Sequence, residues 1–281
     1  MLTRRQIRVK VMQCIYALTL SHDESLEKQK NFLRISIDNT YILYLLVVSL
    51  LIELHRMEEN FIRLSAKKYL SENDEKYPNK EKFLNNAILK QIVNNSLLQD
   101  ELVKRKLKNW DLHEDYVKIV FNEIKKRIYE YFEDDKLTWV DDIPLVNTFV
   151  LKQLRKVNKE YSQSFFVPKL LKDTDDMVFA NQLLTKTLLN NKKFEEEIQI
   201  KTPNWDKDRI ADIDAILLKM AICELTGFSS IPERVTINEY LEIAKEYSTP
   251  KSSIFINGIL DKLVKEYRID GKLKKTGRGL L

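Results

Sequence analysis

Three arginines near the amino terminus have a type and spacing suited to binding an anion. Arg4, Arg5 and Arg8 lie in a segment with apolar residues at helical spacing, which Thr3 can cap and which extends to about Leu20. At 3.6 residues per turn the three arginines share an arc of roughly 100°. Guanidinium groups bind phosphate through paired hydrogen bonds, so this arc is a candidate phosphate-binding surface. The same pattern also fits a solvated basic face on a surface helix.

The residues that could support catalysis do not form a recognisable site. Asp212, Asp214 and Glu224 share one predicted helix, but Arg209 and Lys219 flank them, and such acids are usually exposed or ion-paired. Glycine-rich phosphate loops and the His-Glu-x-x-His motif are missing from the sequence. The two cysteines and three histidines are scattered along the chain, so we expect no metal site, no cofactor and no catalytic residue.

Composition favours a soluble all-α protein. Only five glycines and six prolines occur in 281 residues, of which 44% are hydrophobic, so there is little material for tight β-turns. The net charge of +5 is too small to indicate nucleic-acid binding by itself. The longest uncharged run, 39–52, is shorter than the roughly 20 residues that cross a bilayer and predicts a buried helix. Without a secretory signal pattern, we expect a cytoplasmic protein.

The carboxy-terminal part of the chain has the clearest pattern and predicts three helices, over residues 206–226, 236–247 and 250–267. Thr236 and Glu239 have the spacing of a capping box at the start of the second. Thr249 offers a cap for the third, and Pro250 suits its first position. Gly258 lies inside that helix, where we expect it to allow close packing against a neighbour.

The middle of the chain predicts further helices with few motifs. Apolar stripes indicate helices over 41–70, 80–107 and 112–131, and the linkers between elements fall at 71–79 and 133–144. We expect residues 22–161 to behave as a semi-autonomous helical unit.

Three ordered motifs resemble one protein family. The stretches RIADIDAILLKMAICEL, IPERVTINEYLEIAKEY and FINGILDKL are similar to the carboxy-terminal signature of the NusB transcription antitermination family. The family also begins with an arginine-rich helix, onto which fall Arg4, Arg5, Arg8, Gln13, Ile15 and Tyr16. Val9 departs from that pattern, because the family usually has Glu there. The resemblance implies a NusB-like helical bundle core with an additional inserted helical region.

The resemblance also implies the boundaries of this arrangement. Residues 1–20 form the first, basic helix of the core, 21–164 the helical insertion, 165–267 the remainder of the core, and 268–281 a basic flexible tail.

A function follows from the resemblance as an expectation. It implies a non-enzymatic RNA-binding factor that binds the boxA element of ribosomal RNA leaders with NusE, a small-subunit ribosomal protein, so that RNA polymerase resists termination. The implied RNA-binding residues are Arg4, Arg5, Arg8, Gln13, Lys251, Ser252, Ser253 and Phe255. By pattern alone Phe255 could equally be a core aromatic or a partly exposed ring that stacks on a base. We expect packing of the first helix to bring its arginines towards residues 251–255.

Two other functions remain as alternatives. The same helical domain occurs fused to ribosomal RNA cytosine methyltransferases, but that enzyme needs a glycine-rich cofactor domain and a Pro-Cys nucleophile, and this sequence has neither. The middle region could also be an independent protein-interaction module.

Overall fold

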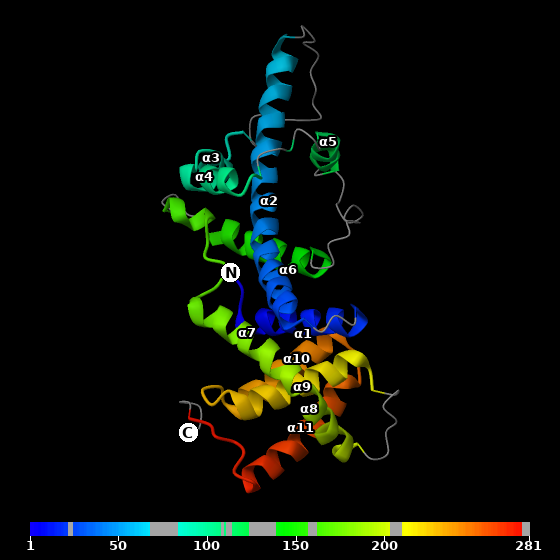
Figure 1. Ribbon diagram of the computed structural model, residues 1–281. Coiled ribbons are helices and arrows are strands. Elements are labelled where there is room, and N and C mark those ends of the chain that lie inside the picture. Colours follow the sequence, from blue (N-terminus) through cyan, green and yellow to red (C-terminus); the bar gives the residue numbers. More distant parts are fainter. Residues whose placement is uncertain are drawn as a thin grey trace. The chain divides into compact units, whose positions relative to one another are not determined.

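The computed structural model describes residues 1–21, 25–67, 84–107, 110, 114–123, 139–156, 162–202 and 210–276. Within these ranges every regular element is a helix (Figure 1). The all-α class predicted from the sequence is therefore confirmed.

The chain divides into two compact units. Unit 1 consists of Met1 and Asp38–Leu170, and unit 2 consists of Leu2–Ile37 and Leu171–Leu281. The domain boundaries predicted at 20, 164 and 267 stay predictions. The independent folding of residues 22–161 stays a prediction.

Unit 1 is built on a long helix and several shorter ones. They are α2 (Leu26–Lys67, from Asp38 onward), α3 (Ala87–Val93), α4 (Ser96–Lys104), α5 (Glu114–Glu123), α6 (Trp139–Lys156) and the 3-10 helix η2 (Gln163–Phe166). Its main core contains Tyr41, Leu43, Tyr44, Leu45, Val48, Ile92, Leu98, Leu102, Val146, Val150 and Phe166. The Tyr44 hydroxyl donates to the Phe166 carbonyl at 3.0 Å, which ties η2 to α2.

Three predictions for this unit need correction. Residues 84–107 form two short helices, because the Asn95 side chain accepts a hydrogen bond from the Leu98 N–H and starts α4 there. The predicted linker 133–144 overlaps α6, which begins at Trp139 and tolerates Pro144 in its second turn. Helix α2 begins at Leu26 rather than near Tyr41. The linker at 71–79 lies outside the described residues.

Helix α2 is long and apolar enough to cross a membrane by length and composition. Its most apolar stretch has a mean hydropathy of 1.9, and 50% of that stretch is buried inside the protein. The buried helix predicted at 39–52 accounts for this, because Tyr41, Tyr44, Leu45 and Val48 all lie in the core. A core helix of a soluble protein gives the same signal.

Unit 2 is organised around an almost fully buried helix. Its helices are α1 (Arg4–Ser21), α7 (Thr174–Leu189), α8 (Asn191–Lys201), α9 (Asp212–Gly227), α10 (Glu233–Tyr247) and α11 (Ser252–Ile269), together with the first turns of α2. Helix α9 contacts α1, α7, α8, α10 and α11 (Figure 1). Apolar side chains surround it from Ile216 to Leu225, which is the pattern of a helix buried on all sides.

The three carboxy-terminal helices begin at other residues than predicted. Helix α9 starts at Asp212 after an extended Ala211, and the predicted start at 206 lies outside the described residues. Helix α10 starts at Glu233, directly after Pro232, so Thr236 is buried inside the helix and cannot cap it. Helix α11 starts at Ser252.

Two further expectations for the carboxy-terminal end are not met. Gly258 lies exposed on α11, and a Cβ built there would meet nothing within 4 Å, so it does not serve close packing.

After α11, Gly271 adopts a positive φ of 64°, and the Lys272 N–H donates to the Tyr267 carbonyl at 2.8 Å. The chain then returns to the end of α9, where the half-buried Lys275 ammonium donates to the carbonyls of Glu224 and Phe228. A mobile tail from residue 268 does not account for these contacts, and residues 277–281 lie outside the described part.

Candidate nucleic-acid interface

Helix α1 begins with a reciprocal cap. The Gln6 N–H donates to the Thr3 hydroxyl at 3.4 Å, and the Thr3 N–H donates to the Gln6 side-chain oxygen at 2.7 Å. The cap fixes the first turn, which carries Arg4 and Arg5, while Arg8 follows one turn later. Ile7, Val11 and Cys14 are fully buried on the apolar side of the helix.

The guanidinium of Arg8 is buried in an ion pair. Its Nε and Nη2 donate to the two carboxylate oxygens of Glu224 at 2.8 and 2.7 Å. The Arg8 side chain is 3% exposed and that of Glu224 is 0% exposed. Glu224 also accepts hydrogen bonds from the Thr236 hydroxyl at 2.9 Å and the Tyr240 hydroxyl at 3.2 Å. Every oxygen of the buried carboxylate is therefore hydrogen-bonded, as a buried charge requires.

Burial and pairing act in opposite directions on this guanidinium. Burial lowers the pKa of Arg8, but the hydrogen bonds and the charge of Glu224 raise it, and the net pKa lies above its usual value. Burial likewise raises the pKa of the adjacent Tyr240 hydroxyl well above its ordinary value. Arg8 thus remains a cation and Tyr240 a neutral donor at neutral pH.

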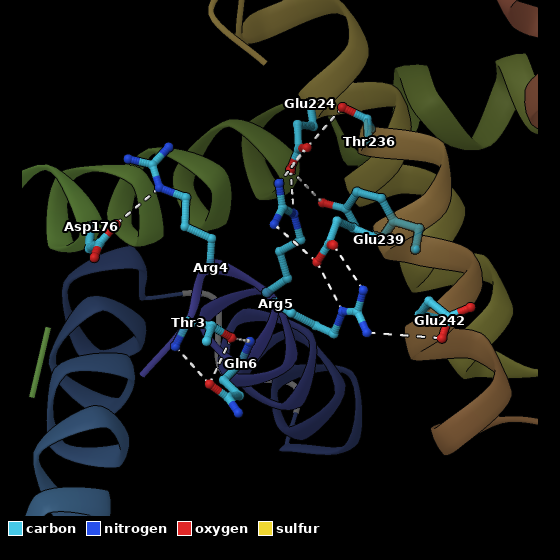
Figure 2. A network of polar contacts seen from close by, with 11 residues as sticks. Thr3, Arg4, Arg5, Gln6, Asp176, Glu224, Thr236, Glu239 and Glu242 are labelled. Atoms are coloured by element: carbon cyan, nitrogen blue, oxygen red, sulfur yellow. Dashed lines mark hydrogen bonds and ion pairs between the residues drawn. The ribbon is translucent and has the colours of Figure 1, made fainter. Parts of the chain in front are cut away.

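Arg5 lies nearer the surface and faces two acids of α10. Its Nε and Nη2 donate to the two oxygens of Glu239 at 3.0 and 2.9 Å, and its Nη1 lies 3.9 Å from Glu242 (Figure 2). The Arg5 side chain is 39% exposed. The hydrogen bond from Arg5 lowers the pKa of Glu239, and the same hydrogen bond raises the pKa of Arg5. Both groups are therefore charged at neutral pH.

Arg4 is the most exposed of the three arginines. Its Nε donates to Asp176 in the first turn of α7 at 3.0 Å, and its side chain is 43% exposed (Figure 2). The guanidinium carbon also lies 5.0 Å from the centre of the Phe179 ring, a cation–π contact. Since only Nε is engaged with Asp176 in these contacts, the outer nitrogens can approach another anion.

The start of α11 is held in place by a buried carboxylate of α9. Asp214 accepts hydrogen bonds from the hydroxyls of Ser248 at 2.6 Å and Ser252 at 2.7 Å, which flank the turn before α11. Ser252 is therefore buried. Lys251 is exposed, whereas Ser253 and Phe255 are half-buried.

The two predicted groups of RNA-binding residues are anchored to opposite ends of α9. Arg8 pairs with Glu224 in the last turn of α9, and Ser252 bonds to Asp214 in its first turn. A helix rises 1.5 Å per residue, so about 15 Å separates these anchors along the axis. The expectation that packing brings the arginines towards residues 251–255 stays a prediction.

Sequence reasoning found the cations of this cluster but not their partners. The sequence pattern places Glu239 in a capping box and leaves Glu224 as either a solvent-facing or an ion-paired acid. In the structure both are ligands of arginines on α1. Gln13, the remaining predicted residue on α1, is half-buried.

The described residues hold no group of three or more His, Cys, Asp or Glu side chains that could bind a metal ion. The three arginines of α1 instead lie at different depths: Arg8 is buried, whereas Arg4 and Arg5 reach solvent. Such an arrangement can bind a phosphate-bearing ligand.

The carboxy-terminal region is similar to known proteins of one family. The model of the NusB family matches residues 146–265. A transcription antitermination protein NusB from Salinibacter ruber is 44% identical over 103 residues, which span 37% of this chain and 64% of the relative. The NusB protein of Chloroherpeton thalassium is 41% identical over 103 residues, which span 37% of this chain and 49% of the relative. The chain thus spans between about half and two-thirds of the lengths of these relatives.

A solved structure of Thermotoga maritima NusB is also similar. It is 27% identical, with 45% of this chain and 89% of that chain covered, and the TM-score is 0.34. At this score the likeness carries no argument about the arrangement of the helices, and the similarity to the NusB family depends on the sequence matches.

Proposed function

We propose that the protein is a non-enzymatic, RNA-binding factor of transcription antitermination, because residues 146–265 match the model of the NusB family. The relatives carry the name transcription antitermination protein. The factor acts in the cytoplasm and binds a boxA-type element in the leader of ribosomal RNA together with the ribosomal protein NusE. The resulting complex helps RNA polymerase to resist termination.

The observation that carries this proposal is the packing of the basic helix α1 onto the matched region. The family match begins at residue 146, so α1 lies outside it. Each of the three arginines of α1 nevertheless pairs with an acid inside the match, at positions 176, 224 and 239. The basic helix and the family domain are therefore parts of one folded unit, as an RNA surface with contributions from both requires.

The structure supports different roles for the three arginines. Arg4 and Arg5 are about two-fifths exposed and are proposed to contact RNA phosphates. Arg8 is buried against Glu224, so we assign it a positioning role: it fixes α1 on α9 and thereby sets where Arg4 and Arg5 reach solvent. Two phosphate contacts to single-stranded RNA predict a salt slope of at most about −1.4 in log affinity against log salt.

The start of α11 is proposed to supply the contacts to bases. Lys251 is exposed there, and Phe255 is half-buried, so one side of its ring can stack on an unpaired base. Ser252 holds the turn through Asp214, while Ser253 and Gln13 are proposed polar contacts. A single strand of RNA would then run along unit 2 from one end of α9 towards the other.

RNA binding at several salt concentrations tests this assignment. The double variant Arg4→Gln/Arg5→Gln should bind a boxA-type single strand more weakly and lose up to about 1.4 of the salt slope. A matched control is Lys262→Gln/Lys265→Gln, which removes two exposed positive charges from a later part of α11. If both double variants lose the same affinity and the same salt slope, only net charge matters, and Arg4 and Arg5 are not specific phosphate contacts.

A second variant tests the base contact. Phe255→Ala should weaken RNA binding roughly tenfold, since stacking on an aromatic ring contributes about 1–3 kcal/mol per base, with little change in salt slope. Circular dichroism must show a folded variant. A folded variant with wild-type affinity removes Phe255 from the site.

The partner is tested by footprinting a ribosomal RNA leader on the purified protein with and without NusE. NusE should extend or strengthen protection of the boxA-type element. Identical protection in both samples would argue against joint binding.

A further inference from the structure

The arginine that we propose as a phosphate contact already holds a carboxylate in the position that a phosphate would take. Both Nε and Nη2 of Arg5 donate to Glu239, which is the forked geometry in which guanidinium groups bind phosphate. The remaining nitrogen, Nη1, lies 3.9 Å from Glu242. An incoming phosphate therefore cannot use this Nε–Nη2 fork of Arg5 without displacing Glu239.

The charges around α1 support the same conclusion. The three guanidinium groups of Arg4, Arg5 and Arg8 pair with four carboxylates, which belong to Asp176, Glu224, Glu239 and Glu242. Glu242 has in addition a lysine partner, Lys245, at 2.6 Å on the same helix. With that lysine included, positive and negative charges in the cluster are equal in number. The first helix is basic in sequence, but in the folded protein each of its three arginines is paired with at least one carboxylate.

From this geometry we infer that Glu239 and Glu242 act as an internal counter-ligand of Arg5 and set the affinity of the protein for RNA. The inference deepens the proposed function and depends on it. Phosphate binding at Arg5 becomes an exchange in which one anion replaces another. Only the difference in free energy between the contact of Arg5 with phosphate and its contact with the carboxylates then contributes to the affinity for RNA.

The exchange also changes how binding responds to salt. A cation that neutralises a phosphate releases counterions from the RNA, and this release produces the salt slope. When Arg5 leaves Glu239 and Glu242 for a phosphate, the two freed carboxylates attract cations in turn. Net ion release is therefore smaller than two exposed arginines would give. Removal of one carboxylate should make the slope steeper.

Glu242 is the better residue for the test. Its side chain is 43% exposed and lies on the outer face of α10, so its charge contributes little to the fold. Glu239 also lies 3.6 Å from the buried Arg8, and its replacement would disturb the packing of α1 as well. Glu242→Gln keeps the shape of the side chain and removes only the charge.

The experiment measures affinity for two fluorescent RNA probes of equal length, one with the boxA-type element and one of oligouridine, at several salt concentrations. Glu242→Gln should bind both about two- to fivefold more tightly at low salt, as expected for one exposed ion pair, with a steeper salt slope. The difference should vanish near 1 M salt, where the Debye length is about 3 Å. Glu196→Gln, which removes one exposed negative charge from α8, is the matched control and should change neither quantity as much.

A double-mutant cycle shows whether the effect acts through Arg5. In an Arg5→Gln background, Glu242→Gln should no longer raise affinity beyond the gain of the Glu196→Gln control. An undiminished gain in that background overturns the inference, and so does a wild-type protein that binds RNA as tightly as Glu242→Gln. A wild type that binds neither probe overturns the proposed function itself, so the two failures are distinguishable.

Discussion

The buried pair of Arg8 and Glu224 makes a strong prediction for stability. Glu224→Gln has nearly the shape of the original side chain and can still accept a hydrogen bond from Thr236. It replaces one carboxylate oxygen with an N–H donor, which faces the donors of Arg8. The charge of Arg8 is then left in a site where its side chain is 3% exposed.

The magnitude follows from the cost of a buried charge that has lost its partner. Removal of one member of a buried ion pair costs about 3–5 kcal/mol. Glu239 lies 3.6 Å from Arg8 and compensates in part, so we expect the lower end of this range. Arg8→Met should cost a similar amount, because Glu224 then keeps only two hydroxyl donors. The double variant Arg8→Met/Glu224→Leu should cost clearly less than the sum of the single variants Arg8→Met and Glu224→Leu.

The assay is unfolding in urea, in which the reactivity of the two thiols is the readout. Cys14 and Cys223 are both buried in unit 2, so their exposure reports on that unit separately from the rest of the chain. With a denaturant slope of about 2 kcal/mol per molar urea, a loss of 3 kcal/mol lowers the midpoint by about 1.5 M. Circular dichroism recorded in parallel shows whether the two units unfold together. A midpoint within about 0.5 M of wild type for Glu224→Gln, or strictly additive losses in the double variant, would refute the reasoning.

Three further predictions concern other parts of unit 2. The pKa of Glu239 is lowered in the folded protein, so its contribution to stability is present above about pH 4.5 and is lost as pH falls through the folded pKa. Between pH 7 and pH 3 the urea midpoint of Glu239→Gln should therefore fall less than that of the wild type. Burial raises the pKa of Cys14 to about 12 and that of Cys223 to about 11, so neither thiol should react with a disulfide reagent at pH 8 until the protein is unfolded; rapid labelling of either thiol in the folded state would contradict this. Gly258→Ala should raise stability by about 0.5–1 kcal/mol, because the position is exposed and helical and a Cβ has room; a lower unfolding midpoint would show an unforeseen contact.

Local sequence patterns predicted the helices well where their structure depends on residues that are close together in the sequence. The cap at Thr3, the extent of α1 and the burial of the middle of α2 all depend on residues within a few positions of one another. The same approach failed at Thr236 and Glu239, whose spacing matches a capping box. Pro232 starts α10 one turn earlier and leaves both side chains for long-range contacts.

The depth of each arginine could not be predicted either. Arg4, Arg5 and Arg8 share an arc of α1, and nothing local distinguishes them. Their depth depends on which helices pack beside α1, and these come from residues more than 150 positions later. The position of a residue on a helical wheel gives the direction of its side chain from the helix axis, but it does not give the depth of that side chain below the protein surface.

The sequence separation within the Arg8–Glu224 pair has a consequence for synthesis of the protein. The two residues are 216 positions apart, and the chain of unit 1 is made between them. At about 5–20 residues per second, α1 leaves the ribosome roughly 10–40 s before its partner is made. During that interval the helices α7, α9 and α10, which pack beside α1 in the finished protein, have not all been made. The first helix to be translated can therefore complete its packing only after the last of these helices has been made.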